Sequence, residues 1–392
     1  MRPSVLRFDR VDLGRGRRSS YQISLIFAGL LAAFAVGGPA APAHSADLDY
    51  GKPGDPIHLS VGYQPYYTEA WSGVVVNGLQ TWKKYLPPGS TVEFNTGLQG
   101  AIIINAMLAG KESIGYVGDM PAIVGATKRE VADLRIVAAI GLGRDECNVM
   151  LVRNDAPAFA DQKAAVQWLT GKTVAVPKGS CSDRFAQAVF QAEHVTPGEY
   201  LNQSIEVITS GFRAGKLDAA VVWEPTASRL VLEGLARRIA SSTIIDEHDG
   251  AFIDMREDLL RQRPDVATAW LQSELDAERF LGDPKNAAQV VKFASQQTTG
   301  LSEKALWYSL YHAYPAAVGG VPTRLTLPFV FTDEIRSLIT RDTAFLYSIK
   351  SIGIAQLADD AVVTRFAEQV LKERGLTSPV AEVVSLTDEP TN

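Results

Sequence analysis

Short apolar runs that are typical of β-strands alternate with amphipathic stretches along most of this chain. The run 57–63 alternates apolar and polar residues in the manner of a strand. Further strands are expected over 91–94 and 173–176, and amphipathic helices over 99–109 and 183–192 follow them. Strands separated by crossover helices are typical of α/β proteins, so the sequence predicts that fold class.

The second half of the chain carries weaker strand signals. A strand is expected over 205–208, followed by a short helical turn over 211–215. From about residue 264 onward the pattern is helical. The last residues, 377–392, contain few apolar anchors, so they are expected to fray.

The chain has 392 residues, a length that suggests two domains or one large one. A unit of strand, polar turn and helix occurs near residue 95 and again near residue 177, which predicts two similar lobes. The 2 Cys are too few for a disulfide scaffold or a four-Cys zinc site. A formal net charge of −6 argues against a nucleic-acid-binding protein, which usually has a basic surface.

The N-terminal segment 1–46 has a composition of its own. A stretch with six Arg precedes the uncharged run 21–38, and a tail of small residues follows that run. These three regions are typical of a secretory signal, with cleavage expected between Ala43 and Ala46. A membrane-anchoring helix is the alternative, but the small-residue tail favours cleavage. Both Sec and twin-arginine export remain open. Cleavage would lower the net charge to −10, because the segment holds six Arg and two Asp.

Sequence signatures of enzymes are missing from the chain. It contains no G-x-S-x-G, no H-E-x-x-H and no paired C-x-x-C motif. The stretch AGKE at 109–112 lacks the Ser or Thr of a phosphate-binding loop. The His residues after residue 46 are far apart in the sequence, so no local pattern marks them as metal ligands. The sequence therefore predicts a protein that is not an enzyme, with no catalytic residue, no metal and no cofactor.

Polar turns follow two of the predicted strands, at 97–100 and 178–183. Ligands in open α/β sheets bind outside the carboxyl ends of the strands. The first N–H groups of a helix are unpaired, and its dipole favours an anion there. Taken singly, each turn is also explained by helix capping, for example by Ser180. The two turns, together with Asp119 and the pair Trp223–Glu224, favour a shared cleft.

Four sequence blocks occur in an order that resembles a known family. They are GYQP at 62–65, the segment 109–121 with IGYVGDMP, GKTVAVPKGS at 171–180 and AGKLDAAVVWEP at 214–225. This order resembles the periplasmic solute-binding proteins of ABC importers in the sulfonate/nitrate/taurine-type family. The resemblance implies a two-lobed type II periplasmic-binding-protein fold with C-terminal helices.

The resemblance also implies a division of the chain into lobes. Hinge crossovers are expected near 144–149 and 239–246. Residues 47–146 and 246–392 would form lobe 1, and residues 147–245 would form lobe 2, after the signal peptide 1–46.

Matching motifs imply a set of ligand-binding residues in a cleft between the lobes. Hydroxyl and N–H groups would bind an anionic head, aromatic rings would cover an apolar portion, and a carboxylate would accept from a donor on the ligand. The implied residues are Gln64, Tyr66, Gln99, Asp119, Ser180, Cys181, Ser182, Ser210, Trp223 and Glu224.

Cys181 departs from the family pattern, in which a small or hydroxyl residue usually occupies this position. The other cysteine, Cys147, falls at the expected hinge-proximal strand. Three alternatives stay open: a disulfide between Cys147 and Cys181, two unpaired thiols, or a soft-metal or thiophilic ligand.

The implied function is the periplasmic substrate-binding component of an ABC importer that captures a small anion such as a sulfonate, taurine or nitrate. Its expected partners are the small-molecule ligand and an inner-membrane permease, and it is expected to be a monomer. The alternatives are an aromatic acid or a thiamine-precursor pyrimidine as ligand, an enzyme on the same fold, or a sensory receptor.

Overall fold

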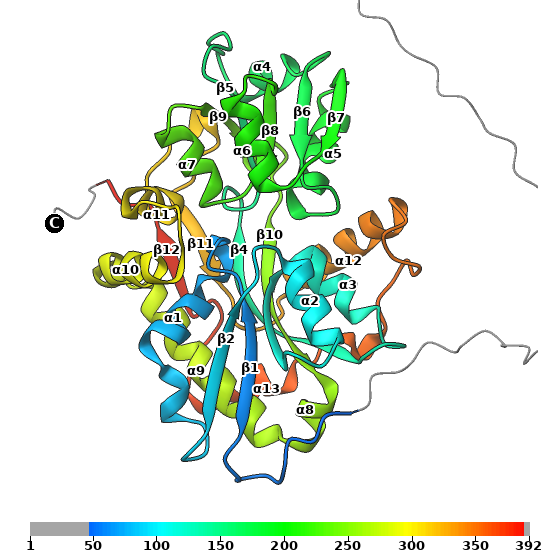
Figure 1. Ribbon diagram of the computed structural model, residues 1–392, viewed down its shortest axis with the longest axis vertical. Helices are drawn as coiled ribbons and strands as arrows, with labels where there is room; N and C mark the ends of the chain where they lie inside the picture. Colours follow the sequence, from blue (N-terminus) through cyan, green and yellow to red (C-terminus); the bar gives the residue numbers. More distant parts are fainter. Residues whose placement is uncertain (1–46, 388–392) are drawn as a thin grey trace, which may run out of the picture. The chain divides into compact units, whose positions relative to one another are not determined.

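The strands of this protein form two separate sheets. The computed structural model describes residues 47–387, so the predicted signal peptide, 1–46, lies outside the described residues. One sheet has seven strands in the order β12-β11-β4-β10-β3-β1-β2, and the other has five in the order β7-β6-β8-β5-β9 (Figure 1). We call the part built around the seven-stranded sheet the large lobe and the part built around the five-stranded sheet the small lobe.

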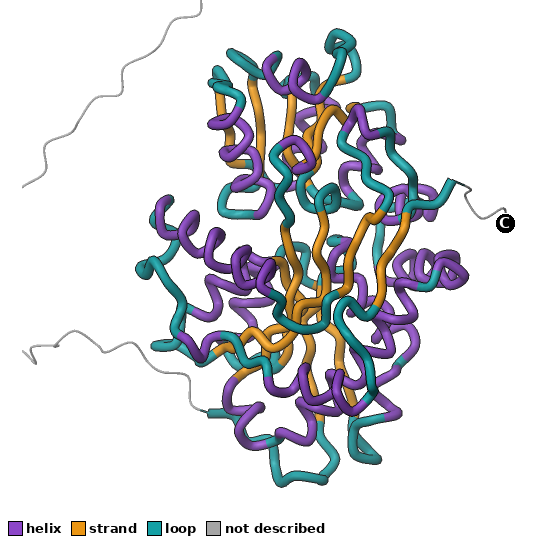
Figure 2. The backbone as a smooth tube through the Cα atoms, turned by 180° about the vertical axis from the view of Figure 1, so that it is seen from behind, coloured by secondary structure: helices purple, strands orange, loops and turns teal. Residues whose placement is uncertain are grey.

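The strands of the large lobe come from two regions of the chain, one before and one after the small-lobe strands. They are β1 (His58–Tyr63), β2 (Thr91–Thr96), β3 (Ile114–Gly118), β4 (Leu134–Gly143), β10 (Asp249–Arg256), β11 (Thr323–Leu327) and β12 (Ala381–Val384). The small-lobe strands are β5 (Val149–Arg153), β6 (Thr173–Val176), β7 (Glu199–Asn202), β8 (Ala219–Val222) and β9 (Ala236–Ser241). The chain thus passes between sheets after β4 and returns after β9. Figure 2 shows the strands in two groups joined by loop segments. The exact lobe boundaries stay a prediction.

Both lobes contain parallel strands joined by helices. β1 pairs in parallel with β2 and β3, and β6 pairs in parallel with β7 and β8. β10 and β5 run antiparallel to their neighbours. Parallel strands need crossover connections, which the amphipathic stretches supply. The carboxyl ends of parallel strands meet at one edge of a sheet, so the polar turns after them gather there.

Thirteen α-helices surround the sheets in the described part of the chain. They are α1 (Trp71–Leu79), α2 (Gly100–Leu108), α3 (Asp119–Ala126), α4 (Gln162–Gln167), α5 (Cys181–Ala192), α6 (Ile205–Arg213), α7 (Thr226–Leu232), α8 (Glu257–Gln262), α9 (Pro264–Gly282), α10 (Ala287–Gln297), α11 (Glu303–Leu310), α12 (Asp333–Ser348) and α13 (Arg365–Glu373). The C-terminal helices begin with α9, which packs on α1 and buries Trp270. No helix among residues 47–387 is long and apolar enough to cross a membrane.

Two predicted elements differ from the structure. The strand expected over 205–208 is wrong, because α6 begins at Ile205 and Ser204 caps it. Ile205, Ile208 and Phe212 are buried at helical spacing, which a four-residue apolar run does not reveal.

The C-terminal segment also departs from its prediction. β12 pairs antiparallel with β11 and buries Val383. Residues 381–384 are therefore an edge strand of the large sheet, and the expectation that this part frays is wrong. Strand pairing with a segment more than 50 residues away stabilises it, and a local count of apolar residues does not show such pairing.

Candidate ligand-binding site

A cavity of about 300 Å³ lies between the two lobes. Its walls come from the carboxyl ends of β1, β2, β3, β6 and β8 and from the first turns of α2, α3 and α5. The lining residues are Gln64, Tyr67, Gln99, Gly100, Ala101, Ile104, Asn105, Gly118, Asp119, Pro121, Val124, Pro177, Lys178, Gly179, Ser180, Cys181, Trp223 and Ser351. The cavity therefore occupies the place where α/β sheets usually bind ligands.

Helix N-termini from both lobes open into this cavity. In the large lobe, α2 begins at Gly100, and the Gln99 side chain makes no capping hydrogen bond. A Cβ at Gly100 would lie 2.4 Å from the Pro121 ring, so only glycine fits this approach of α2 to α3. The first N–H groups of α2 have no partner within the helix and are available to a ligand.

The small lobe contributes the N-terminus of α5. The Ser180 side chain accepts from Asp183 N and donates to Pro177 O at 2.6 Å, which fixes the turn between β6 and α5. This local cap satisfies one N–H group and leaves those of Cys181 and Ser182 without a helical partner. The two helix starts place two positive dipole ends at one cavity.

Six of the residues that the sequence resemblance implied line the cavity. Gln64 is buried and donates to Tyr116 O at 3.3 Å, which orients its amide. Trp223 lies on the small-lobe side, and its Nε1 donates to the backbone oxygen of Tyr66 at 3.1 Å. The other four are Gln99, Asp119, Ser180 and Cys181. Their contact with a ligand stays a prediction.

Two implied residues point elsewhere. The hydroxyl of Tyr66 accepts from Thr299 N at 2.8 Å, outside the cavity. Its neighbour Tyr67 lines the cavity instead, because a turn with Tyr67 N donating to Gln64 O reverses the chain here. Ser210 is exposed on α6 and donates to Glu206 O, because its segment is a helix and not the expected strand end.

Two further implied residues lie buried behind the wall. Ser182 donates to Cys147 O at 2.7 Å. Glu224 accepts from Ser228 N at 2.8 Å and lies 3.6 Å from Arg238 Nη1. Burial raises the pKa of Glu224 to about 7, against the opposing effect of Arg238. Both residues support the wall and are not among those that line it.

Asp119 brings a carboxyl group to a cavity that otherwise suits an anion. Its two oxygens accept from Met120 N and Gly250 N. Burial, and then the neighbouring Asp342 and Asp249, raise the pKa of Asp119 well above its usual value. The group therefore presents less negative charge to the cavity than an exposed aspartate would.

Sequence reasoning missed several lining residues. Lys178 is exposed, and its ammonium group lies 4.9 Å from the ring centre of Tyr200. Its position in the predicted polar turn 178–183 is a signal that could have identified Lys178 as a lining residue. Asn105 lies one helical turn inside α2, and Ser351 comes from a distant part of the chain, so no local pattern marked either of them.

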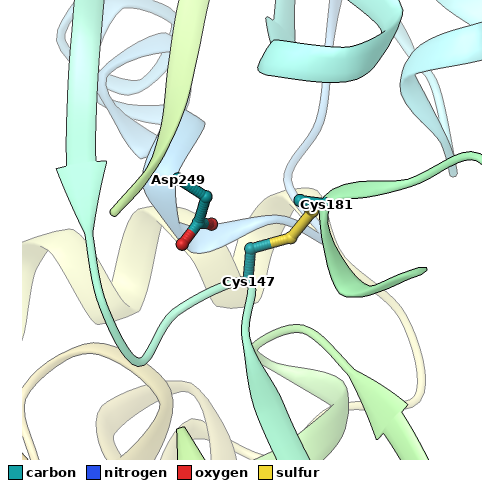
Figure 3. Close-up of side chains that lie close together, drawn as sticks. All are labelled: Cys147, Cys181 and Asp249. Carbon is teal, nitrogen blue, oxygen red and sulfur yellow. A yellow bond between two sulfur atoms is a disulfide. The ribbon is translucent and has the colours of Figure 1, made fainter. Parts of the chain in front are cut away.

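The two cysteines form a disulfide, with the Cα atoms 6.3 Å apart (Figure 3). It joins the first crossover, at Cys147, to the first residue of α5, at Cys181. Closing a loop of this size stabilises the folded state by about 3–4 kcal/mol in the chain-entropy account. The disulfide thus fixes the α5 N-terminus against the crossover segment.

Comparison with known proteins places the chain in a family. A family model described as the NMT1-like family matches residues 53–295, more than half of the chain. The chain belongs to the NMT1-like family. The taurine-binding periplasmic protein of Escherichia coli (strain K12) is similar to this NMT1-like chain. The two are 25% identical over 251 residues, which cover 61% of this chain and 73% of that protein.

Solved structures match the fold of this NMT1-like protein. The alkanesulfonate-binding protein from Xanthomonas axonopodis pv. citri, bound to MOPS, has a TM-score of 0.62 and 19% identity, and the match covers 80% of this chain and 99% of that one. A desulfurization enzyme matches with a TM-score of 0.57 and 15% identity, over 81% of this chain and 99% of that one. These likenesses show the fold alone. They confirm the predicted two-lobed α/β fold. The family-model match, with which the similarity to the taurine-binding protein agrees, confirms the predicted resemblance.

Proposed function

We propose that this chain is the substrate-binding component of an ABC importer and captures a small anion of the sulfonate, taurine or nitrate class between its lobes. The observation that carries the proposal is the cavity into which the N-termini of α2, from the large lobe, and α5, from the small lobe, open. Unpaired N–H groups and two helix dipoles bind an anion without a full counter-charge. The ligands in the names of the relatives support the same class.

The remaining wall of the cavity suits an organic group attached to the anion. Ile104, Val124 and Pro121 supply apolar surface from the large lobe, and the Trp223 ring supplies it from the small lobe. Small-molecule sites usually combine such apolar walls with a few placed polar groups. A short alkyl or aminoalkyl sulfonate therefore fits the lining better than nitrate, which has no apolar part.

Contacts between the lobes indicate how a ligand favours their closed arrangement. Thr68 N in the large lobe donates to Glu224 O in the small lobe at 3.3 Å. Arg184 Nε on α5 lies 3.1 Å from Asp342 Oδ1 on α12. With the Trp223 hydrogen bond, these contacts join the lobes beside the two crossovers. A ligand that touches both lobes selects this state by hinge closure.

The proposal includes export to the periplasm, delivery of the ligand to a membrane permease, and action as a monomer without covalent chemistry. The Cys181 sulfur, which would be a strong nucleophile of the cavity wall as a thiolate, is held in the disulfide. A desulfurization enzyme shares the fold, so turnover is tested directly. Mass spectrometry after incubation with an alkanesulfonate is expected to recover it unchanged, and release of sulfite would contradict this part.

Thermal unfolding tests the ligand class. Taurine, an alkanesulfonate and nitrate are compared with an aromatic acid and a thiamine-precursor pyrimidine. A bound ligand at a hundred times its Kd stabilises the folded state by about 2.7 kcal/mol, so we expect a clear rise in Tm with a sulfonate. Small-angle scattering is expected to show a smaller radius of gyration. No change in Tm with any of the anions would overturn the proposal.

Lys178→Ala is expected to weaken sulfonate binding about twofold to fivefold, because one exposed charge near the anion contributes up to about 1 kcal/mol. Isothermal titration calorimetry at low and high salt measures the effect, which should shrink as salt rises. Lys216→Ala is the matched control, since Lys216 is exposed in the same lobe but does not line the cavity. Equal effects of the two variants would remove Lys178 from the binding site.

A further inference from the structure

Three buried side chains meet where the first crossover, α5 and β10 come together. They are Cys147, Cys181 and Asp249, which are 0%, 7% and 0% exposed. One possible metal-ligand atom of each lies within 4.8 Å of those of the other two. Figure 3 shows the Asp249 side chain beside the disulfide, at its Cys147 end. The arrangement places two sulfur atoms and one carboxylate oxygen close together.

One oxygen of Asp249 receives no N–H or hydroxyl donor. Its Oδ1 accepts from Asn148 Nδ2 at 2.8 Å, whereas its Oδ2 is buried and accepts from no N–H or hydroxyl group. A buried carboxylate oxygen without a donor costs free energy, and a bound cation is one way of satisfying it. Glu69 is also buried beside Asp249, and the two carboxyl groups are hydrogen-bonded to each other.

We propose that the reduced form of this protein binds one thiophilic cation of the Zn²⁺ and Cd²⁺ class through the Cys147 and Cys181 thiolates and the Asp249 carboxylate. Such cations prefer thiolate ligands and accept a carboxylate beside them. Three protein ligands leave the fourth tetrahedral position open to water or another small ligand.

The disulfide controls whether this site exists. A dithiol reductant supplies two electrons and two protons, the S–S bond breaks into two thiols, and the reductant becomes a cyclic disulfide. The cation then displaces both thiol protons to the solvent. In an oxidising compartment the disulfide persists and the cation site stays closed.

The ligand cavity gives a cation its route to this site. Cys181 lines the cavity, whereas Cys147 and Asp249 lie behind it and are not among its lining residues. A cation that enters the cavity therefore meets the Cys181 sulfur first. The site uses groups that the proposed anion site does not need, since that site relies on backbone N–H groups of α2 and α5. Binding of an anion by the oxidised protein and of a cation by the reduced protein are therefore separate properties.

Cadmium titration of the full chain tests the proposal. The protein is reduced with a dithiol, freed of the reductant under anaerobic conditions and titrated with Cd²⁺. We expect one Cd²⁺ per chain, with the near-ultraviolet absorption of cadmium–thiolate bonds, and none of this absorption in the oxidised protein. Circular dichroism checks that the reduced protein stays folded. Absence of the absorption in reduced, folded protein would overturn the proposal.

Variants identify the ligands. Cys147→Ser and Cys181→Ser are each expected to abolish the paired-thiolate signal. Asp249→Asn should weaken Cd²⁺ binding by about tenfold or more, because losing a ligand costs at least as much as losing an outer partner of one. Asp254→Asn is the matched control, since Asp254 is a buried acid with unpartnered oxygens on the same strand. Equal affinities of the two variants would exclude the carboxylate as a ligand.

A measurement without variants covers the case in which these substitutions prevent folding. One equivalent of Cd²⁺ is expected to slow alkylation of both thiols in the reduced wild-type chain. Unchanged alkylation would count against the site. Failure here leaves the proposed anion function untouched, because that is measured on the oxidised protein.

Discussion

At the scale of single residues, Arg324 connects the first crossover to the large lobe. It lies on β11 and is fully buried. Its Nε is 3.0 Å from Asp145 Oδ1, its Nη2 pairs with Glu146, and its Nη1 donates to His312 O. Burial raises the pKa of Glu146 to about 8, and the Arg324 charge opposes that rise. One guanidinium group thus holds two buried acids next to the hinge.

Arg324→Ala is expected to lower the free energy of unfolding by about 3–5 kcal/mol, because it leaves buried acids without their partner. Urea denaturation measures the loss. Arg336→Ala is the matched control, since Arg336 is exposed on α12, and it should change stability by less than about 0.5 kcal/mol. Similar losses for both variants would show that the buried pairs do not stabilise the fold.

At the scale of elements, α6 illustrates how a short helix is defined by its ends. Ser204 accepts from Val207 N before the first turn, and Gly215, with φ of +63°, follows the last residues. Ile208 and Phe212 bury one face of the helix, and Ser210 lies exposed on the other. Because α6 turns Ser210 to the solvent, this element decides that the residue is not in the cavity.

Ser204→Ala is expected to destabilise the protein by about 1 kcal/mol, because an unpaired N–H remains at the start of α6. Ser204→Asp should retain most of the stability, since aspartate also caps and its charge suits the helix dipole. The comparison is made by urea denaturation. If the alanine and aspartate variants are equally stable, the cap contributes nothing.

At the scale of the whole molecule, buried carboxyl groups dominate the response to pH. The pKa values of Glu112, Glu146, Glu224, Asp249 and Glu274 are raised to about 7 or 8, in each case mainly by burial. The folded state therefore holds more protons than the unfolded state between about pH 5 and pH 8. The stabilising contribution of these protonated groups is fully present below their unfolded pKa and is lost as pH rises through the folded pKa.

We expect the free energy of unfolding to be larger near pH 5 than near pH 8, as measured by urea denaturation across this range. Glu112→Gln should reduce that difference, because burial alone raises the pKa of Glu112 and its Oε2 has no partner. Glu368→Gln, at an exposed position, is the matched control and should leave the difference unchanged. Greater stability near pH 8 than near pH 5 would contradict the prediction that these buried carboxyl groups stay protonated in the folded state.

Local patterns predicted the elements that position the cavity. Strand 91–94 and helix 99–109 correspond to β2 and α2, and the expected helix 183–192 corresponds to α5. These predictions succeeded because apolar spacing and turn residues report on a few neighbouring positions. The prediction failed at 205–208, because four residues fit both a strand and a helix. It also failed at β12, because pairing with the distant strand β11 determines the structure of that segment.

By itself, the sequence determined the α/β class, the resemblance to solute-binding proteins and the two polar turns at helix starts, because each of these is written in contiguous residues. Only the tertiary structure decided that Tyr67 and not Tyr66 faces the cavity, and that Asp249 lies beside the two sulfur atoms. The direction of a side chain depends on the turn that carries it, and the meeting of distant residues depends on how the sheets and crossovers pack. Neither of these is contained in a local pattern.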